Sequence, residues 1–483
     1  MSNPVHIVLG CADVLAPKIR YVFDTLFMAR GLPIVYSVTP PSSGIWILYG
    51  NHKGLSSWPN ERCLGIAHHP ETWRFFDEKT DIEVSVNIEG LSTIFPQQVT
   101  EFNSLYDISF DLIANAFYFL CSWSERLKSD NNETRCLYAN SIFKRLNIAQ
   151  DIVDQYLQHI LNLYDSLGER LGTGTRNPLA LPNNAAYAVV LSHDVDFIPY
   201  GFFDIAKQGI KTVLRHLIRQ RALDDAISSA FGLASALIRR RDPFGCIPYI
   251  IAEEKKLGVQ ASFQVAVGHR HPYDVNYRIE DESICDYLTA IPDAGFDLCL
   301  HGSYRSTEKE EWYVEEAALL THHLGKPIGS RQHFLSFDYD TLFRAQEQAG
   351  ILYDMSMGYP DHTGSRNGFS FPYFPYCLAE NRPFKVLEFS LFLMDVTLRS
   401  YMDLKGARAW DEIKTALDKL RLNQGCVSTV WHPIVFGGVR DPGYDDLFWK
   451  MIGYIKETGG LATDGRTLNE FWRTRASDYA SFK

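Results

Sequence analysis

The feature that most constrains this sequence is a regular alternation of short apolar runs with longer amphipathic segments after residue 185. The amphipathic segments end at glycines such as Gly258, Gly295 and Gly350, where a left-handed residue can stop a helix before the next strand. Repeated strand and helix units of this size predict a parallel sheet with right-handed crossovers, either a closed barrel or a doubly wound sheet. The seven strand candidates are residues 187–191, 261–267, 296–300, 327–331, 351–356, 386–395 and 426–431.

Polar side chains stand at the carboxyl ends of these runs. The first run, AYAVVLSHDVD at 186–196, ends in His193, Asp194 and Asp196. The later candidates are His301, Arg331, His333, Asp354, Asp395 and His432. A barrel gathers catalytic groups from the ends of many strands, whereas a doubly wound sheet gathers them at one switch point. The distribution therefore predicts an α/β protein whose residues 185–483 form a seven-stranded (β/α) barrel.

These residue types form a coherent set for metal-assisted hydrolysis. Asp196 and His301 are suitable ligands for a divalent ion, which with a third ligand would make a zinc-type catalytic site. Asp194 could act as a base on water, and a histidine from the far side could protonate the leaving group. A lone aspartate after a strand is more often a turn or helix cap, so the hypothesis depends on the joint placement of these groups.

Six motifs in this order resemble a divergent polysaccharide deacetylase of carbohydrate esterase family 4. They are HDVD at 193–196, HGSY at 301–304, RQHF at 331–334, YDMSMGYPDHTGSRNG at 353–368, LEFSLFLMD at 387–395 and VWHP at 430–433. The resemblance implies a distorted barrel of seven βα units, which agrees with the strand count. The segment DLIANAFYFLCSWSER at 111–126 is similar to an uncharacterised domain found ahead of such deacetylases in bacteria.

The resemblance also implies a role for each matching residue. Asp194 matches the catalytic base and Arg331 the arginine that pairs with it, while His432 matches the general acid, with Asp395 as its orienting partner. Asp196 and His301 match two metal ligands. The implied reaction is hydrolysis of an N-acetyl group on an amino sugar, with the oxyanion held by the metal and a backbone N–H near Phe334.

One position departs from the family pattern. Family members commonly carry a second histidine four residues after the first, but here that residue is Arg305, which cannot coordinate a metal. We predict that His333 supplies the third ligand to a divalent ion, with zinc expected. In the competing interpretation His333 contacts substrate, and water or a carboxylate is the third ligand.

The rest of the chain divides into three parts. The pattern of residues 1–171 predicts a smaller α/β accessory domain, with helices near 111–123 and 151–171. The composition of residues 172–184 is typical of a linker. Residues 197–242 predict a helical insertion in the barrel. Its basic residues are Lys207, Lys211, Arg215, Arg219, Arg221 and Arg239 to Arg241. Two interpretations of this insertion remain open: a solvated helix face, and a site that binds an anionic ligand or a membrane surface.

Composition limits the partners. A formal net charge of −11 argues against nucleic acid, because phosphate binding needs a positive field. We expect no secretory signal and no transmembrane segment, and nine cysteines without CxxC pairs suggest reduced thiols in a cytoplasmic protein. The expected partner is a carbohydrate, an acetamido sugar that could be polymeric, lipid-linked or nucleotide-linked.

The sequence thus predicts a metal-dependent de-N-acetylase acting on a bacterial glycan or its precursor. An O-deacetylase or an N-deformylase acting on a sugar would use the same residues and differ in pocket shape. A noncatalytic carbohydrate-binding protein would be expected to have lost the metal set or the acid, and all of these residues are present.

Overall fold

The computed structural model describes two compact units. The described residues are 4–11, 13–50, 60–78, 80–98, 106–127, 135–173, 181–219, 222–239, 243–244 and 246–480, without the side chains of 202, 219, 239 and 478–480. The first unit comprises residues 1–181, 365–385 and 470–483, and the second comprises 182–364 and 386–469.

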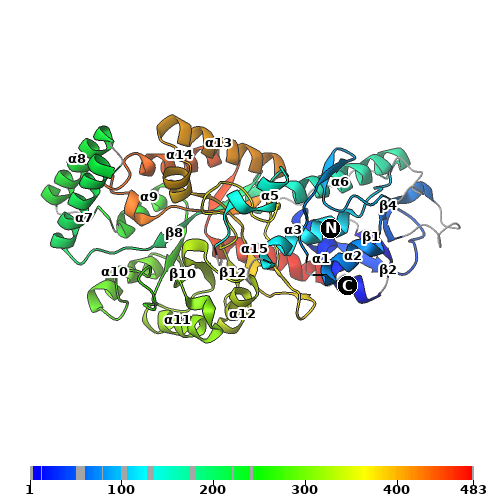
Figure 1. Ribbon diagram of the computed structural model, residues 1–483, viewed down its shortest axis with the longest axis horizontal. Coiled ribbons are helices and arrows are strands. Elements are labelled where there is room, and N and C mark those ends of the chain that lie inside the picture. Colours follow the sequence, from blue (N-terminus) through cyan, green and yellow to red (C-terminus); the bar gives the residue numbers. More distant parts are fainter. Residues whose placement is uncertain are drawn as a thin grey trace. The chain divides into compact units, whose positions relative to one another are not determined.

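The first unit is built on a four-stranded parallel sheet in the order β2-β1-β3-β4 (Figure 1). Its strands are β1 (Val5–Gly10), β2 (Ile34–Ser37), β3 (Trp46–Gly50) and β4 (Cys63–Ala67). The main helices are α1 (Ala16–Ala29), α3 (Leu112–Leu120) and α6 (Ile152–Leu171). The smaller elements are α2 (Pro70–Arg74), β5 (Val86–Ile88), β6 (Leu91–Thr93), α4 (Trp123–Arg126), α5 (Ile142–Arg145), β13 (Tyr376–Cys377) and β14 (Arg382–Pro383).

The two helices expected in this unit are confirmed, with slightly different ends. α3 begins after Asp111, whose side chain accepts a hydrogen bond from the Ala114 amide at 3.0 Å and so caps the helix. α6 buries Ile152, Tyr156 and Ile160 along one stripe and ends at Gly172, which has a φ of 66°. The periodicity of apolar residues in the sequence therefore predicted both helices correctly.

The second unit contains two parallel sheets, one of six strands in the order β15-β12-β11-β10-β9-β8 and one of four in the order β16-β17-β7-β18. The strands are β7 (Ala188–Val190), β8 (Ser192–Val195), β9 (Ser262–Val265), β10 (Asp297–Gly302), β11 (Gly329–Gln332), β12 (Tyr353–Asp354), β15 (Leu387–Glu388), β16 (Leu391–Met394), β17 (Cys426–Val430) and β18 (Leu461–Thr463). The helices are α7 (Phe202–Leu214), α8 (Leu223–Arg239), α9 (Ile247–Leu257), α10 (Glu282–Asp293), α11 (Glu310–His323), α12 (Tyr339–Ala349), α13 (Gly406–Asn423) and α14 (Tyr444–Glu457), and α15 (Gly465–Ala480) runs from this unit into the first. This is an α/β architecture in which each of the seven predicted runs contains a strand.

Two predicted strands are each divided between the two sheets. The opening run forms β7, which pairs with β17, and then β8, which pairs with β9. The run at 386–395 likewise forms β15, paired with β12, and β16, paired with β17 across a bulge at Leu391 and Leu393. The pairings consequently form a circuit through all seven runs.

Three features differ from the sequence-based division. Residues 365–385 and 470–483 group with the first unit, although both had been assigned to the barrel. The strand β18, which pairs with β7, was not predicted because Leu461–Thr463 is too short to show a pattern. Most of the predicted linker at 172–184 lies outside the described residues.

The insertion after the opening strand is helical, as expected. α7 continues into a π-helical turn at Arg215–Arg219, and α8 follows. None of the helices, as far as they are described, is long and apolar enough to cross a membrane.

Candidate functional site

The opening strand β8 separates its side chains onto two faces. Side chains alternate along a strand, so Ser192 and Asp194 share one face while His193 points the other way. His193 Nδ1 donates to the Trp431 carbonyl oxygen at 2.7 Å, and its Nε2 lies 3.0 Å from Glu254 Oε1. It is therefore a buried structural residue that fixes the strand. Asp194 lies inside β8, although the strand predicted from the sequence ended at residue 191.

Asp194 forms a buried ion pair with Arg331 of β11. Arg331 Nη1 donates to Asp194 Oδ1 at 2.6 Å and to Ser192 Oγ at 2.8 Å, while its Nε donates to the Met355 carbonyl oxygen at 2.9 Å. These bonds hold the guanidinium and orient the carboxylate, whose Oδ2 lies 3.8 Å from His301 Nε2. The sequence predicted the ion pair but missed Ser192, which resembles an ordinary strand residue.

Asp196 and His333 directly follow β8 and β11, and they converge with His301 near the carboxyl end of β10. His301 Nε2 lies 3.2 Å from Asp196 Oδ1, and His333 Nε2 lies 3.6 Å from the same oxygen. One nitrogen or oxygen atom from each of the three residues lies within 4.8 Å of the others. A Cβ at Gly302, next to His301, would lie 2.5 Å from Gln332 Oε1 and 2.8 Å from a ring carbon of Tyr313, so the glycine lets these two side chains pack against the end of β10.

The donor chemistry of this group fits a divalent metal ion. Asp196 Oδ1, the oxygen that faces the Nε2 atoms of His301 and His333, is buried and accepts no hydrogen bond from the described residues. The Nδ1 of His301 bonds the Arg331 carbonyl oxygen at 2.9 Å, which leaves the lone pair of Nε2 directed at the group. One carboxylate and two imidazoles are the ligands of catalytic zinc sites.

The pKa values of Asp196 and His333 suit this assignment. Burial raises the pKa of Asp196, but His333, His301 and His432 outweigh burial and hold it below its usual range. Burial lowers the pKa of His333 to about 4, so its imidazole is neutral at pH 7 and offers a lone pair. Burial also lowers the pKa of His301, but Asp194 and Asp196 raise it by more.

A histidine and aspartate pair lies on the other side of Asp196. His432 follows β17, and its Nδ1 lies 2.6 Å from Asp395 Oδ1. Its Nε2 is 3.4 Å from Asp196 Oδ2 and so faces the group. Burial lowers the pKa of His432, but Asp395 outweighs burial and raises it to about 9, so the ring is protonated at pH 7.

The second unit therefore brings together all seven predicted site residues. Asp194, Asp196, His301, Arg331, His333, Asp395 and His432 are linked by contacts of 3.8 Å or less. Asp354, another strand-end candidate, is used structurally, because its carboxylate accepts from Gln346 and Ser356. Arg305 lies 3.3 Å from Glu308 with its side chain half exposed, so it makes no contribution to the metal group.

Sequence reasoning missed a group of aromatic rings beside His333. His271 stacks on Tyr304 with ring centroids 4.6 Å apart, and Phe334 lies 5.5 Å from Tyr273 and 5.6 Å from Tyr304. Phe334 follows His333 with a φ of 59°, a strained value for a residue with a side chain, and its ring is 40% exposed. We call His271, Tyr273, Tyr304 and Phe334 the aromatic group.

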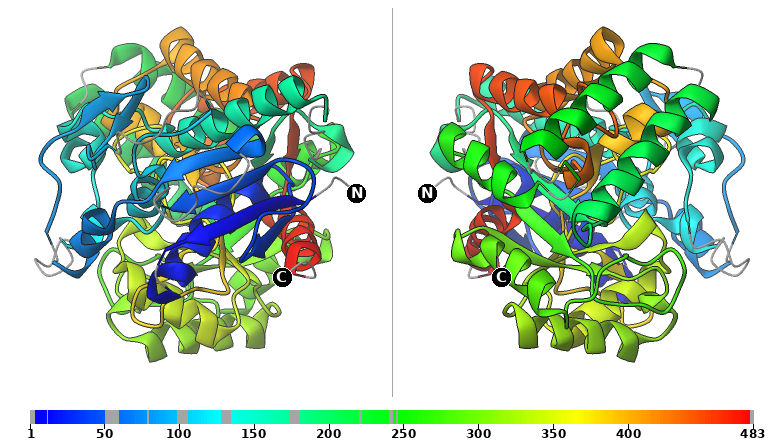
Figure 2. Two further views of the ribbon diagram at one scale, coloured as in Figure 1. Left: turned by 90° about the vertical axis from the view of Figure 1, so that its right-hand side faces the viewer. Right: turned by 90° about the vertical axis from the view of Figure 1, so that its left-hand side faces the viewer.

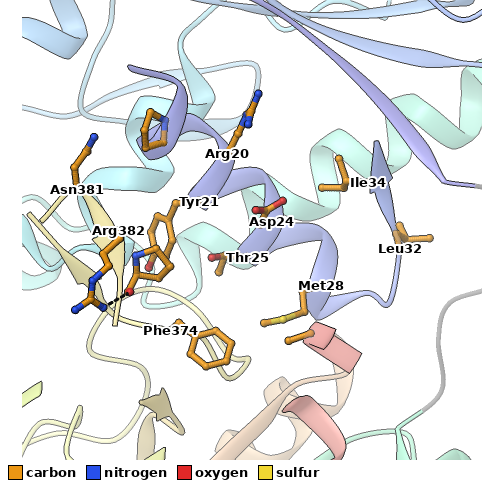
Figure 3. Close-up of a pocket in the computed structure, with 13 residues that line it drawn as sticks. Arg20, Tyr21, Asp24, Thr25, Met28, Leu32, Ile34, Phe374, Asn381 and Arg382 are labelled. Carbon is orange, nitrogen blue, oxygen red and sulfur yellow. Dashed lines mark hydrogen bonds between the residues drawn. The ribbon is translucent and has the colours of Figure 1, made fainter. Parts of the chain in front are cut away.

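The first unit has a separate cavity of about 320 Å³ (Figure 3). Tyr21, Met28 and Phe374 line it with apolar surface, and Arg382 donates to the Pro383 carbonyl oxygen at 2.9 Å at one side. Asp24 at its wall accepts a hydrogen bond from Tyr36 at 3.0 Å. The described residues that line it include no histidine or cysteine and a single carboxylate, Asp24, so the cavity lacks the several ligands that a metal site needs.

Comparisons with known proteins give one family match and similarities to solved structures. Residues 8–168 match the model of a family of unknown function, DUF7033. No curated protein matches this sequence. Solved structures that align include "Puue Allantoinase", at 15% identity and a TM-score of 0.40, covering 62% of this chain and 94% of that one. A "probable Polysaccharide deacetylase from Pseudomonas aeruginosa PAO1" aligns at 14% identity and a TM-score of 0.38, covering 62% of this chain and 95% of that one. At these scores the alignments support no inference, so the proposal below depends on this chain's own residues.

Proposed function

We propose that this protein is a divalent-metal-dependent amide hydrolase that removes the N-acetyl group of an acetamido sugar. One observation carries the proposal. The Asp194–Arg331 ion pair and the His432–Asp395 pair flank the same three-residue group of Asp196, His301 and His333. A positioned base, a metal-ligand set and a protonated acid are the components that metal-assisted amide hydrolysis requires.

Asp196, His301 and His333 would hold the metal ion. Such an ion supplies Lewis acidity toward water and toward the acyl oxygen. Asp194 takes the proton of the attacking water at Oδ2, since Oδ1 is engaged by Arg331. Arg331 keeps the carboxylate in place during this transfer, because two further hydrogen bonds, to the Met355 carbonyl oxygen and Ser192 Oγ, fix its own position.

His432 completes the reaction by protonating the departing amine. Asp395 binds Nδ1 and so leaves the Nε2 proton directed at the group. Since the pKa of His432 is raised to about 9, this proton is present at neutral pH. Acetate and a free sugar amine are the products.

The aromatic group supports a sugar as the substrate. Aromatic rings present a flat apolar surface, and tyrosine adds a polar tip that can bond a hydroxyl. Tyr273 is 58% exposed beside Phe334, whose neighbour His333 is a proposed ligand. A sugar ring stacked there would place its acetamido substituent at the metal group.

We also propose that the two sheets of the second unit are halves of the predicted distorted seven-stranded barrel. The circuit of pairings through the seven runs supports this proposal, and so does the Asp194–Arg331 bond at 2.6 Å. β8 and β11 are separated by β9 and β10, and neighbouring strands lie about 4.8 Å apart. The two side chains can meet in this way only if the sheet curls strongly.

The proposed reaction is tested by incubating the purified protein with chitooligosaccharides, a nucleotide-linked N-acetyl sugar and the matching O-acetylated and N-formylated sugars. We expect acetate and amine in equal amounts from an N-acetylated substrate. Release only from O-acetyl or N-formyl substrates would contradict the N-acetyl assignment, and no release from any of these substrates would contradict the hydrolase proposal.

The third ligand can be tested separately by metal titration. His333→Ala should weaken zinc binding by more than about 100-fold, since disturbing a residue that only supports a ligand already costs 10- to 100-fold. His271→Ala is the matched control, because that imidazole stacks on Tyr304 and does not contact Asp196. Unchanged zinc affinity in His333→Ala would assign His333 to substrate contact instead.

Substitution in the aromatic group should weaken substrate binding and leave the rate of the chemical step unchanged. Tyr273→Ala should raise KM for an oligosaccharide roughly 3- to 10-fold and leave kcat nearly unchanged, because one aromatic contact contributes about 0.5–1.5 kcal/mol. Steady-state kinetics of Tyr273→Ala and of the control Tyr273→Phe are measured on the same substrate. A large fall in kcat with unchanged KM would show that Tyr273 acts in the chemical step.

A further inference from the structure

The insertion after β8 forms a helical hairpin of α7 and α8, which lie side by side at one edge of the second unit (Figures 1 and 2). Small and polar residues form its inward side. Gly209 packs against Leu233, where a Cβ would lie 2.4 Å from a leucine methyl carbon, and Gly232 packs against the Gly438 backbone. His216 Nε2 lies 3.0 Å from the Arg440 carbonyl oxygen. We call α7, the turn at Arg215–Arg219 and α8 the hairpin.

The outward side of the hairpin carries its large apolar side chains. Phe203 is 86% exposed, Phe231 75% and Ile238 83%. Nine of the twenty-one large hydrophobic residues that are exposed in the described part of the chain lie on the hairpin. They are Phe203, Ile210 and Leu214 on α7, Leu217 and Ile218 in the turn at Arg215–Arg219, and Leu223, Ile227, Phe231 and Ile238 on α8.

These residues form a stripe on each helix. The spacing from Phe203 to Ile210, Leu214 and Leu217 is 7, 4 and 3 residues, and the spacing along α8 is similar, so each set stays on one side. A helix that served only as a solvated face would carry polar residues there. The stripe is therefore a surface suited to an apolar environment.

The hairpin is also the basic part of an acidic protein. Residues 202–241 contain eight Lys or Arg and three Asp, whereas the whole chain has a net charge of −11. Lys207 and Lys211 are exposed on α7, and Arg239 is the last residue of α8. In sequence, Arg221 lies between the helices, and Arg240 and Arg241 follow α8. Arg215 is an exception among these cations, because it donates to the Arg440 carbonyl oxygen at 3.0 Å and lies 3.7 Å from Asp441. It therefore binds other residues of the protein and is not counted among the cations at the headgroups.

We propose that the hairpin docks on the surface of an anionic lipid bilayer, with its apolar stripes among the acyl chains and its cations at the headgroups. Large apolar residues joined to lysines and arginines on one amphipathic element are the pattern of an interfacial helix. A second copy of this chain fits less well. A two-fold interface would place the basic patch against itself. Because the rest of the protein is acidic, the hairpin is the surface that an anionic bilayer attracts.

The proposal is tested by vesicle flotation of the full chain and does not depend on the proposed reaction. The wild type should float with vesicles of phosphatidylcholine and about one-third phosphatidylglycerol, and binding should fall as salt rises. The double variant Phe203→Glu/Phe231→Glu should bind at least about 100-fold more weakly, because each buried phenylalanine contributes about 1.5–3 kcal/mol. Lys207→Gln/Lys211→Gln should weaken binding about 30-fold, at about 1 kcal/mol per cation.

Leu422→Glu is the matched control, because this exposed leucine on α13 is 81% exposed and lies outside the hairpin. It should bind vesicles like the wild type, and the thermal unfolding midpoint of every variant should stay close to that of the wild type. Equal binding to vesicles without phosphatidylglycerol, or no vesicle binding by the wild type, would overturn the proposal. A stable dimer that Phe203→Glu/Phe231→Glu dissociates, together with failure to bind vesicles, would assign the stripe to a second copy and would also overturn it.

Discussion

Replacing Asp194 by asparagine should lower kcat by about 10³-fold or more, at the upper part of the range for a positioned general base. Asparagine can still accept the hydrogen bond from Arg331, but it cannot take a proton from water. Zinc affinity should stay within about tenfold of the wild type, because Asp194 Oδ2 lies 3.8 Å from His301 and Asp194 is not one of the proposed ligands. Single-turnover rates and a zinc titration measure the two effects separately.

Asp354→Asn is the control for removing a buried carboxylate from a strand end of the same unit. Burial raises the pKa of Asp354, so a neutral amide is a mild replacement. Its oxygens accept from Gln346 and Ser356 rather than facing the metal group. We expect kcat within a few-fold of the wild type. Wild-type turnover by Asp194→Asn would remove Asp194 from the mechanism.

Replacing His432 by alanine should lower kcat by about 10²- to 10⁴-fold while zinc stays bound, because the acid acts on the leaving amine and is not needed to hold the ion. Asp395→Asn should lower kcat less, since the imidazole remains in place without its carboxylate partner. Stoichiometric loss of zinc in either variant would contradict the assigned roles.

The pH profile separates the acid from a merely structural histidine. The general acid must be protonated, so the kcat of the wild type should fall as pH rises through about 9, the raised pKa of His432. Asp395→Asn removes the main group that raises this pKa, so the fall should move to lower pH. In His432→Ala this alkaline fall should be absent. An unchanged alkaline profile in both variants would assign the proton to another group.

The site residues could be predicted because each of them lies at or near the carboxyl end of a recognisable strand. Asp194, His301 and Arg331 stand at or near the ends of apolar runs, and the ends of parallel strands meet at one edge of a sheet. The partners of these residues were beyond prediction. Ser192 and the Met355 carbonyl hold Arg331 through contacts between segments far apart in the chain, and no local pattern marks them.

The fold could be predicted less completely, for two physical reasons. A strand that changes partner halfway, as the run through Ala188 and Val195 does, looks like one apolar run in sequence. The segment at 365–385 belongs to the first unit through contacts such as those of Ser370 with Asp154, at 2.6 and 3.1 Å. Such contacts depend on tertiary packing, whereas the amphipathic period of α6 is local and was read correctly.

The central claim is that Asp196, His301 and His333 hold a divalent ion on which catalysis depends. The most direct measurement is acetate release by protein stripped of metal with a chelator and then reloaded, with metal content determined on the same samples. We predict no turnover by the stripped protein and recovery in proportion to zinc or cobalt bound, up to one ion per chain. Full turnover by protein shown to be free of metal would contradict the claim.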